Sequence, residues 1–565
     1  MNYINRSNLN YDAIVIGSGI TGGWAAKELC EGGLKVLLLE RGKDVPHITG
    51  YTNATKQPWE LAYRGLADLE NQQKGKKNST NQFLLGKNEI PYIEKKPFNW
   101  RRGYQVGGKS LIWGRQCYRI GDLDFEQNIK NGIGIDWPIR YKDLAPWYNK
   151  VEQFIGVSGS KEGIEHLPDG NFIPPMELNC LEKEIKKRFT KLYGKNRHFF
   201  IGRTANLTTP IDGRKCYYRN KCHHGCPFGG YFSSQSSTLP AAMKTKNLTI
   251  RPFSIVKDII YDKDLKKAVG VEIIDAETNE NILFKSKIFF LCASTINSAA
   301  ILMNSATNVW PNGLGSCSEE LGHNFMDHHR IGAWGKFDGM HDTYMYGRRP
   351  NGIFIPRFRN VGSDKQDYIG GYNFQGNARR DGNGGIGHNI IGQNIIGNIP
   401  IDKLKDTLTQ PLDWGFEYTA FGETLPYHEN KITLSTDKKD KWGLPLVEID
   451  AEAKENELKM EKDMAKTSIA MLKELGLKDV QLKPGKKVGD KTIGASHEMG
   501  LARMGENPKT AVLNKHNQIW DAKNVFVTDG SCMTSSACQN PSLTYMALTA
   551  RAANFAIQEL KKRNL

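Results

Sequence analysis

The first part of the chain alternates between apolar runs of strand length and a helical pattern. Residues 11–17 (YDAIVIG) form a short apolar run of the kind that makes a strand covered on both faces. Residues 24–29 have a helical pattern that ends at the glycine pair 32–33, and residues 36–40 (VLLLE) predict a second strand. The order of strand, helix and strand predicts a parallel βαβ unit at this end of the chain.

Similar patterns predict elements in the rest of the chain. Short apolar runs that favour further strands lie at residues 248–251, 287–292 and 524–530. Residues 417–421 and 431–435 read as strands of an antiparallel sheet. Residues 451–475 predict one long helix, and a last helix reaches Leu560. Residues 373–399 are rich in glycine and asparagine and predict either a lid over a site or a surface loop.

Composition narrows the class of protein. Of the 565 residues, 39% are hydrophobic and 24% are charged, which is usual for a globular protein and excludes wholesale disorder. No apolar run approaches the roughly 18 residues that a membrane helix needs. The net charge of +16 could serve an anionic partner, but the lysine clusters at 74–77 and 483–487 lie in polar stretches. Because no nucleic-acid-binding signature surrounds them, we expect solvated lysines and no nucleic-acid partner.

The turn after the first predicted strand has the spacing G-x-G-x-x-G. Gly17, Gly19 and Gly22 allow a tight turn, a close approach to a pyrophosphate and close helix packing. The helix that follows offers free N–H groups and the positive end of its dipole to the phosphates. Glu40, at the end of the second strand, can accept hydrogen bonds from ribose hydroxyls. The unit predicts a dinucleotide site but does not distinguish NAD from FAD.

Three further segments carry a resemblance to a known family. They are residues 103–114 (GYQVGGKSLIWG), residues 496–505 (SHEMGLARMG) and residues 524–544, which end in QNPSLT. Together with the N-terminal unit they resemble the glucose–methanol–choline (GMC) family of flavin oxidoreductases, over nearly the whole chain and in the family's order. The resemblance implies FAD as cofactor. The cofactor contacts that it implies are Gly17, Gly19, Gly22, Glu40, Arg41, Gly107, Gly108, Ser110, Trp113, Gly114, Val256, Ala293, Asp529, Gly530, Asn540, Pro541 and Thr544.

The same resemblance implies His497 and Asn540 as the catalytic pair. Oxidation of an alcohol by hydride loss leaves a hydroxyl proton to remove, and a neutral imidazole has a suitable pKa for this. Asn540 can donate a hydrogen bond to the developing alkoxide or orient the hydroxyl. Asp327 and His328 match a family segment that closes the FAD domain. Leu501 stands where the family usually has threonine, so we expect a local change near the flavin.

A compact cysteine cluster is the most unusual stretch of the chain. Cys216, Cys222 and Cys226 lie within eleven residues, and a proline follows the last of them. The three cysteines are compatible with an iron–sulfur cluster, with a zinc site, or with a disulfide that leaves one thiol unpaired. The segment resembles that of membrane-associated FAD sugar dehydrogenase complexes, which implies a three-iron (3Fe–4S) cluster held by the three thiolates and a dehydrogenase rather than an oxygen-using oxidase.

Within the family, residues 18–27, the Arg41–Gly pair and the cysteine segment are most similar to catalytic subunits of glucoside 3-dehydrogenase and gluconate 2-dehydrogenase complexes. This implies a sugar or glycoside substrate, a small partner subunit and a cytochrome or other electron acceptor. The N-terminal residues show no apolar signal region, so the implied periplasmic location would depend on co-export with a signal-bearing partner; otherwise the enzyme would be cytoplasmic. Two alternatives are a pyranose-type oxidase that uses oxygen and a flavin electron-transfer subunit without its own catalysis.

The expected fold is α/β, with a Rossmann-like FAD-binding domain and an α+β substrate domain built on an antiparallel sheet. We expect the FAD-binding domain to be assembled from residues 1–50, 95–150, 240–330 and 490–565. Residues 151–239 would form an insertion that carries the cysteines, and residues 331–489 would form the substrate-binding domain.

Overall fold

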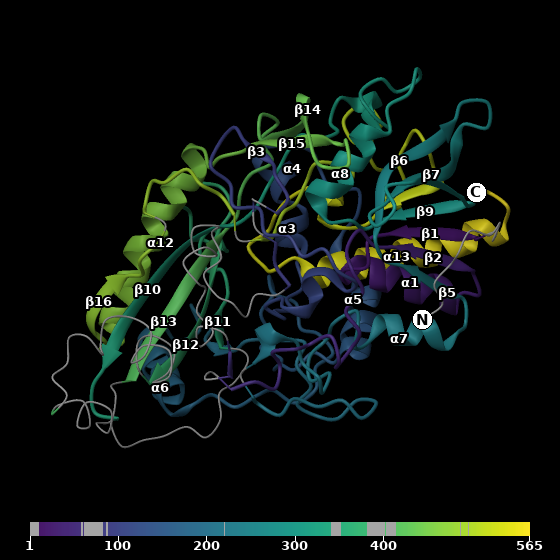
Figure 1. Ribbon diagram of the computed structural model, residues 1–565. Helices are drawn as coiled ribbons and strands as arrows, with labels where there is room; N and C mark the ends of the chain where they lie inside the picture. The colour runs from purple at the N-terminus through teal and green to yellow at the C-terminus, as the bar shows by residue number, and fades with distance from the viewer. Residues whose placement is uncertain are drawn as a thin grey trace.

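A parallel sheet forms one half of the molecule (Figure 1). The computed structural model describes residues 11–57, 60–61, 83–85, 87, 89–219, 221–340, 352–380, 402, 414–485, 487–494 and 496–565. The five strands of this sheet are, in order, β17 (Val525–Val527), β9 (Ile288–Leu291), β1 (Ala13–Ile16), β2 (Val36–Leu39) and β5 (Leu248–Arg251). All neighbours pair in parallel, with Ala13 of β1 opposite both Val36 and Ile288. Strands far apart in the sequence therefore complete the predicted βαβ unit.

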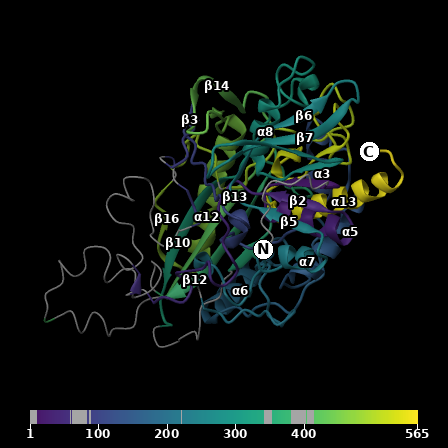
Figure 2. The same cartoon turned by 45° about the vertical axis from the view of Figure 1, so that its right-hand side comes forward.

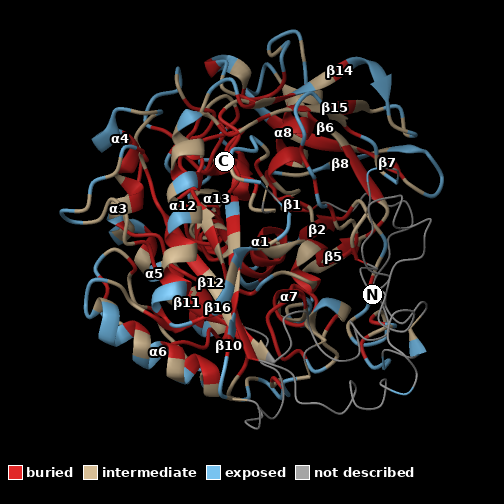
Figure 3. Cartoon of the chain, turned by 90° about the vertical axis from the view of Figure 1, so that its left-hand side faces the viewer, coloured by how far each residue is buried: buried red, intermediate tan, exposed pale blue. Residues whose placement is uncertain are grey.

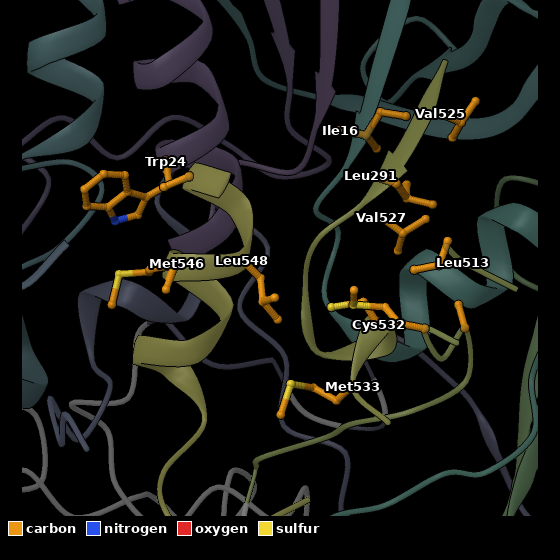
Figure 4. Close-up of a cluster of buried hydrophobic side chains, with 14 of the residues drawn as sticks. Ile16, Trp24, Leu291, Leu513, Val525, Val527, Cys532, Met533, Met546 and Leu548 are labelled. Atoms are coloured by element: carbon orange, nitrogen blue, oxygen red, sulfur yellow. The ribbon is translucent and has the colours of Figure 1, made fainter. Parts of the chain in front are cut away.

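The two ends of the described chain meet on this sheet. Helix α1 (Ile20–Glu31) packs against α13 (Ser542–Lys561), and α13 packs against α5 (Tyr141–Ile155). Figure 4 shows part of the buried core that these elements share, with Trp24 of α1 beside Met546 of α13. Strands β1, β2, β9 and β17 are buried on both faces, as their continuous apolar sequence predicts, while the edge strand β5 is only partly buried.

An antiparallel sheet forms the other half. Its strands are, in order, β16 (Lys478–Leu482), β10 (His329–Phe337), β13 (Trp414–Gly422), β12 (Tyr372–Arg380), β11 (Ile353–Ile355) and β4 (Phe200–Ile201). Helices α12 (Glu455–Glu474) and α6 (Cys180–Tyr193) pack against this sheet and share one apolar core with it (Figures 1 and 2). In Figure 3 the outward surfaces of these two helices and the edge strand β16 are exposed, while the inner strands of the sheet are largely buried.

Two three-stranded sheets complete the structure. One joins β6 (Ser254–Asp262), β7 (Lys267–Asp275) and β8 (Asn281–Lys285), and the other joins β14 (Lys431–Lys439), β15 (Pro445–Asp450) and β3 (Ile93–Glu94). The remaining elements are η3 (Gly108–Leu111), α3 (Asp122–Phe125), α4 (Gln127–Asn131), η4 (Cys222–His224), α7 (Thr238–Lys244), α8 (Thr295–Asn304), η5 (Ser316–Ser318) and η6 (Gly530–Cys532). Among the helices of the described residues, none has the length and apolarity that a membrane span requires.

The predicted fold class is confirmed, but one sequence expectation needs correction. The glycine- and asparagine-rich stretch 373–399 does not begin as a loop, because residues 373–380 belong to β12. This strand pairs with β13 on one side and with β11 on the other. These hydrogen bonds outweigh the low intrinsic strand preference of its glycine and asparagine residues. Residues 381–399 lie outside the described part of the chain, so the lid expectation is not addressed there.

Candidate active site

A cavity of about 730 Å³ lies where the carboxyl ends of the parallel strands meet the antiparallel sheet. This is the edge at which open α/β sheets bind their ligands. The cavity is lined by the turn after β1, the end of β2, η3 and the segments that follow β9 and β17. Arg330, Gln375 and Phe421 line it from the antiparallel sheet. Its volume falls in the range of about 300–1,000 Å³ that is usual for cofactor and ligand sites.

The glycines of the fingerprint have three different physical tasks. Gly17 has φ +93°, a conformation that favours glycine. A Cβ on Gly22 would lie 1.7 Å from the carbonyl oxygen of Gly17, so this glycine allows α1 to pack onto the turn. Gly19 caps the N-terminus of α1, and a Cβ there would meet no atom within 4 Å. Since Gly19 lines the cavity, the space beside it is open at the helix N-terminus, where a phosphate binds favourably.

Glu40 lies at the end of β2, where it is buried and held by the fingerprint turn. Its Oε2 accepts hydrogen bonds from the backbone N–H and the hydroxyl of Ser18, at 3.1 and 2.5 Å, and its Oε1 accepts one from the backbone N–H of Gly42 at 3.0 Å. Burial raises the pKa of Glu40, although these hydrogen bonds oppose that shift. Ser18 Oγ also accepts from the backbone N–H of Gly107 at 2.9 Å, which ties the Gly-Gly loop to the fingerprint.

Most of the predicted cofactor contacts line this one cavity. Those that do are Gly17, Gly19, Glu40, Arg41, Gly108, Ser110, Trp113, Gly114, Val256, Ala293, Asp529, Gly530, Asn540 and Pro541. Three do not. Gly22 lies under the turn, Gly107 caps η3 with φ +92°, and the hydroxyl of Thr544 is 2.7 Å from Tyr148 Oη, inside the protein. These three residues support the cavity wall rather than face its contents.

His497 and Asn540 lie together at the antiparallel end of the cavity. Asn540 Nδ2 is 3.2 Å from His497 Nε2, and Gln375 Nε2 donates to Asn540 Oδ1 at 2.7 Å. On the other side of the ring, His497 Nδ1 is 2.9 Å from His328 Nδ1, and His328 Nε2 is 2.8 Å from the carbonyl oxygen of Ala537. The five groups form one continuous chain of hydrogen bonds.

This chain has one consistent arrangement of protons for two neutral rings. The carbonyl of Ala537 can only accept, so His328 carries its proton on Nε2 and leaves Nδ1 as an acceptor. His497 must then donate from Nδ1, and its Nε2 is left with a lone pair. Asn540 donates to that lone pair, because the amide oxygen of Asn540 is already an acceptor for Gln375. The tertiary structure thus fixes the tautomer in which His497 Nε2 can accept a proton from a ligand in the cavity.

Comparison with known proteins decides what kind of enzyme carries this site. Two family models described as GMC oxidoreductase match residues 11–330 and 426–549. The chain belongs to the GMC oxidoreductase family. This GMC oxidoreductase is therefore a flavoenzyme that acts on CH–OH groups of alcohols or sugars, with FAD as its cofactor.

Characterised relatives and solved structures resemble this GMC oxidoreductase along almost its full length. The fructose dehydrogenase large subunit of Gluconobacter japonicus is 25% identical, covering 99% of this chain and 100% of the relative. The 2-methyl-1,2-propanediol dehydrogenase of Mycolicibacterium austroafricanum is 27% identical, covering 96% and 94%. A formate oxidase from Aspergillus oryzae has the same fold, with a TM-score of 0.64 and 14% identity, covering 99% and 100%.

The residues of the cavity fit FAD. Arg102 is buried and lines the cavity, yet none of its three guanidinium nitrogens has a hydrogen-bond partner among the described residues. Its contacts are instead the rings of Trp100 and Tyr92, at 4.4 and 4.8 Å. A buried guanidinium without acceptors is costly, so its donors call for oxygen acceptors from a ligand in the cavity. The sequence motifs did not indicate Arg102, because no residue spacing marks it.

Burial lowers the pKa of His497 well below its ordinary value, and electrostatic repulsion from the neighbouring His328, Lys109 and Arg330 would further disfavour a second proton on the ring. Because the lowered pKa keeps the ring neutral in mild acid, the base form should persist below pH 6.5, the usual pKa of histidine. We expect the rate constant for flavin reduction by substrate to stay flat as the pH falls through about 6.5 and to decline only in stronger acid. Anaerobic stopped-flow measurements across pH would contradict this if the rate halved at or above that value.

Leu501, the departure from the family motif, does not line the cavity. Leu501 is fully buried and packs in an apolar cluster with Phe325 and Ile296, and it is not among the lining residues of the cavity. The side chain of Leu501 therefore does not face the cavity, and the expected local change near the flavin stays a prediction. Leu501 adopts φ +80°, an uncommon conformation for a branched side chain, which is held by backbone hydrogen bonds to Gly322 and His323.

The cysteine segment lies beside the main cavity. Cys216, Cys222 and Cys226 line a separate small cavity of about 30 Å³, while the neighbouring His223 lines the main one. Burial raises the pKa of the Cys216 thiol to about 11. Across the described residues, no three His, Cys, Asp or Glu side chains are arranged so that they could hold a metal ion. The structure therefore gives the iron–sulfur prediction no support of its own.

Proposed function

We propose that this GMC oxidoreductase is a dehydrogenase that oxidises a secondary alcohol of a sugar or glycoside to the keto-sugar. The observation that carries the proposal is the position of His497 Nε2, 3.2 Å from Asn540 Nδ2 in the cavity that also contains the dinucleotide fingerprint. A base and a hydrogen-bond donor at one point are what alcohol oxidation needs from the protein. A flavin electron-transfer subunit without catalysis would not need this pair.

His497 removes the substrate proton, while Asn540 and Gln375 orient the reacting groups. FAD, when bound, supplies the acceptor for the hydride. His497 Nε2 accepts the hydroxyl proton of the substrate, while its Nδ1–H continues to donate to His328. The N–H of Asn540 then donates to the oxygen on which negative charge develops, and Gln375 keeps the amide turned the right way. The low pKa of His497 means that the ring holds this proton only weakly, so it can pass it on.

The names of relatives support a sugar or polyol substrate and leave the acceptor open. The fructose dehydrogenase large subunit and the gluconate 2-dehydrogenase flavoprotein of Pantoea cypripedii, each 25% identical, favour a dehydrogenase of a sugar. Formate oxidase and the paromamine 6'-oxidase of Streptomyces fradiae favour the alternative, in which oxygen is the acceptor. An anaerobic experiment separates substrate from acceptor: holoenzyme is mixed with a panel of sugars and glycosides, flavin bleaching is followed, and the product is identified. Bleaching by none of them would refute the proposal.

We also propose that the enzyme passes its electrons through the cysteine segment to an external acceptor, with a three-iron cluster on Cys216, Cys222 and Cys226. The sequence spacing supports the cluster itself. The position of the segment, with His223 in the wall of the main cavity beside the small cavity of the cysteines, supports only the route of the electrons. A direct link also supports it: Tyr231 Oη contacts the carbonyl oxygens of Leu111 in η3 and of Cys222. Relatives named as a large subunit and a flavoprotein support partner subunits, and co-export with one of them to the periplasm completes the proposal.

Replacement of Cys222 by serine tests the proposed electron path from the flavin to the external acceptor. If the three thiolates hold iron, Cys222→Ser should lose it and should turn over slowly with a cytochrome or another large acceptor. Flavin reduction by substrate should change little, because proton removal depends on His497 and Asn540. Iron content and the two rates are measured on the same preparation. Cys317→Ser, a change at an exposed cysteine elsewhere, is the matched control. Equal loss of both rates, or wild-type enzyme purified without oxygen that contains no iron, would contradict the proposal.

A further inference from the structure

Arg330 lies at the antiparallel end of the cavity, on the same side as the catalytic pair. Arg330 is the second residue of β10 and follows His329. His329 is buried against α12, where its Nδ1 lies 3.2 Å from Glu461 Oε1. Because side chains alternate along a strand, Arg330 points away from α12, and it lines the cavity. Its cross-strand neighbour Phe421 also lines the cavity.

The guanidinium of Arg330 lacks a counter-ion. Its side chain is exposed to the cavity, and it makes no hydrogen bond or ion pair with any other described residue. The groups that act on it electrostatically are the positive Arg101, which also lines the cavity, and the carboxylate of Asp327. Asp327 Oδ1 accepts from the backbone N–H groups of His328 and His497, at 2.6 and 3.1 Å. Arg330 therefore feels the like charge of Arg101 and the charge of one carboxylate that is already engaged with backbone N–H groups.

Two other cations of the cavity are paired with carboxylates. Lys109 Nζ is 3.2 Å from Glu498 Oε2, and Arg41 is 3.2 Å from Asp440. Arg102 has no hydrogen-bond partner among the described residues, but it belongs to the Arg41 side of the cavity: burial lowers the pKa of Arg102, and the positive charge of Arg41 adds to that shift. The uncompensated charge of Arg330 and Arg101 is thus local to the end where His497 and Asn540 lie.

We propose that the cavity takes a substrate with a carboxylate, a sugar acid such as an aldonate or a uronate, and that Arg330 binds this group. The inference rests on the proposed function and names the substrate class of that site. A guanidinium recognises a carboxylate through two parallel hydrogen bonds, which Arg330 is free to make. Arg330 on β10 and Gln375 on β12 are two strands apart and offset by two residues in register, which is about 12 Å at roughly 4.8 Å per strand and 3.4 Å per residue. A hexose acid held at Arg330 therefore presents a ring or chain hydroxyl to His497, and its carboxylate takes no part in the oxidation.

The test compares acids with neutral sugars of the same skeleton. Holoenzyme is mixed anaerobically with D-glucuronate or D-glucose, and with D-gluconate or D-glucitol, and the second-order rate constant for flavin reduction is measured for each. We expect the acid to react faster in at least one pair, and the ratio of acid to neutral to fall about 100-fold in Arg330→Gln. Arg330→Lys keeps the charge without the paired donors and should give an intermediate ratio.

Lys336→Gln is the matched control, because Lys336 lies on the same strand and the same face as Arg330 but does not line the cavity. Its ratio should equal that of wild type. Flavin content and melting temperature show that each variant is folded. If the neutral member reacts as fast as the acid in both pairs, or if Arg330→Gln slows both members equally, the inference fails while the proposed function stands.

A binding measurement keeps the two proposals separate. If no sugar or sugar acid reduces the flavin, the proposed function fails. Titration of the holoenzyme with D-gluconate, followed by the flavin absorbance spectrum, then decides the inference alone. A saturable spectral shift that weakens at least about tenfold in Arg330→Gln supports a carboxylate site, and the absence of any shift overturns it.

Discussion

His497→Ala is expected to retain FAD and to lose about 10²- to 10⁴-fold in the rate of flavin reduction by substrate. Proton removal by a positioned base is typically worth this much, and no other described side chain takes over, because His328 is buried with its Nε2 donated to Ala537. Anaerobic stopped-flow absorbance measures the rate directly. A loss under about threefold would contradict the assignment of His497 as the base.

His428→Ala provides a matched control for this prediction. His428 is exposed and stacks on His323 outside the cavity, so its removal should leave the rate unchanged. His328→Phe is a second informative variant, because it removes the acceptor for His497 Nδ1–H while keeping an aromatic ring. If His328 acts only by fixing the tautomer of His497, His328→Phe should change the pH dependence of the rate, and His328→Ala should do the same.

Gly19→Val is expected to fold and to bind almost no FAD. The backbone of Gly19 is extended with a negative φ of −66°, so it is outside the left-handed region that requires glycine, and a Cβ there has no neighbour within 4 Å. The added side chain would occupy the space where the pyrophosphate approaches the N-terminus of α1. We expect at least about a 100-fold loss of affinity, which corresponds to about 2.7 kcal/mol. Flavin absorbance of the purified protein measures the cofactor content.

FAD-free wild type and the variant Gly22→Val show whether Gly19→Val loses cofactor binding alone or also loses its fold. The melting temperature of Gly19→Val should match that of wild type stripped of FAD, because both lack only the stabilisation that ligand binding provides. Gly22→Val should instead fail to fold stably, since its Cβ would overlap the carbonyl oxygen of Gly17 at 1.7 Å. A yellow Gly19→Val protein with normal flavin content would refute the assigned position of the pyrophosphate.

The sequence correctly predicted the elements that depend only on residues close to one another in the chain. The glycine spacing from Gly17 to Gly22 needs only one turn and the helix that follows, and the structure has both, with α1 from Ile20 to Glu31. The long helix expected at residues 451–475 is α12, and the apolar runs predicted the strands β1, β2, β5, β9 and β17. Periodicity and turn chemistry are local properties, so they can be recognised without knowing what packs against them.

The sequence did not predict secondary structure or side-chain direction where contacts with distant residues decide them. Residues 373–380 read as part of a loop because glycine and asparagine dominate the stretch, yet they form a central strand between β11 and β13. Leu501 stands in a motif that belongs to the active site, but the backbone turns its side chain into an apolar cluster. In both places tertiary contacts override a local preference.

The candidate site combines both kinds of information. His497 and Asn540 could be named from their motifs, and the sequence alone determined that a dinucleotide fold carries them. Only the tertiary structure decided the proton arrangement, because His328 lies 169 residues before His497 and their ring nitrogens meet at 2.9 Å. It also decided that Arg330 and Gln375 face the cavity, since strand pairing and pleat, which no motif encodes, set the direction of each side chain.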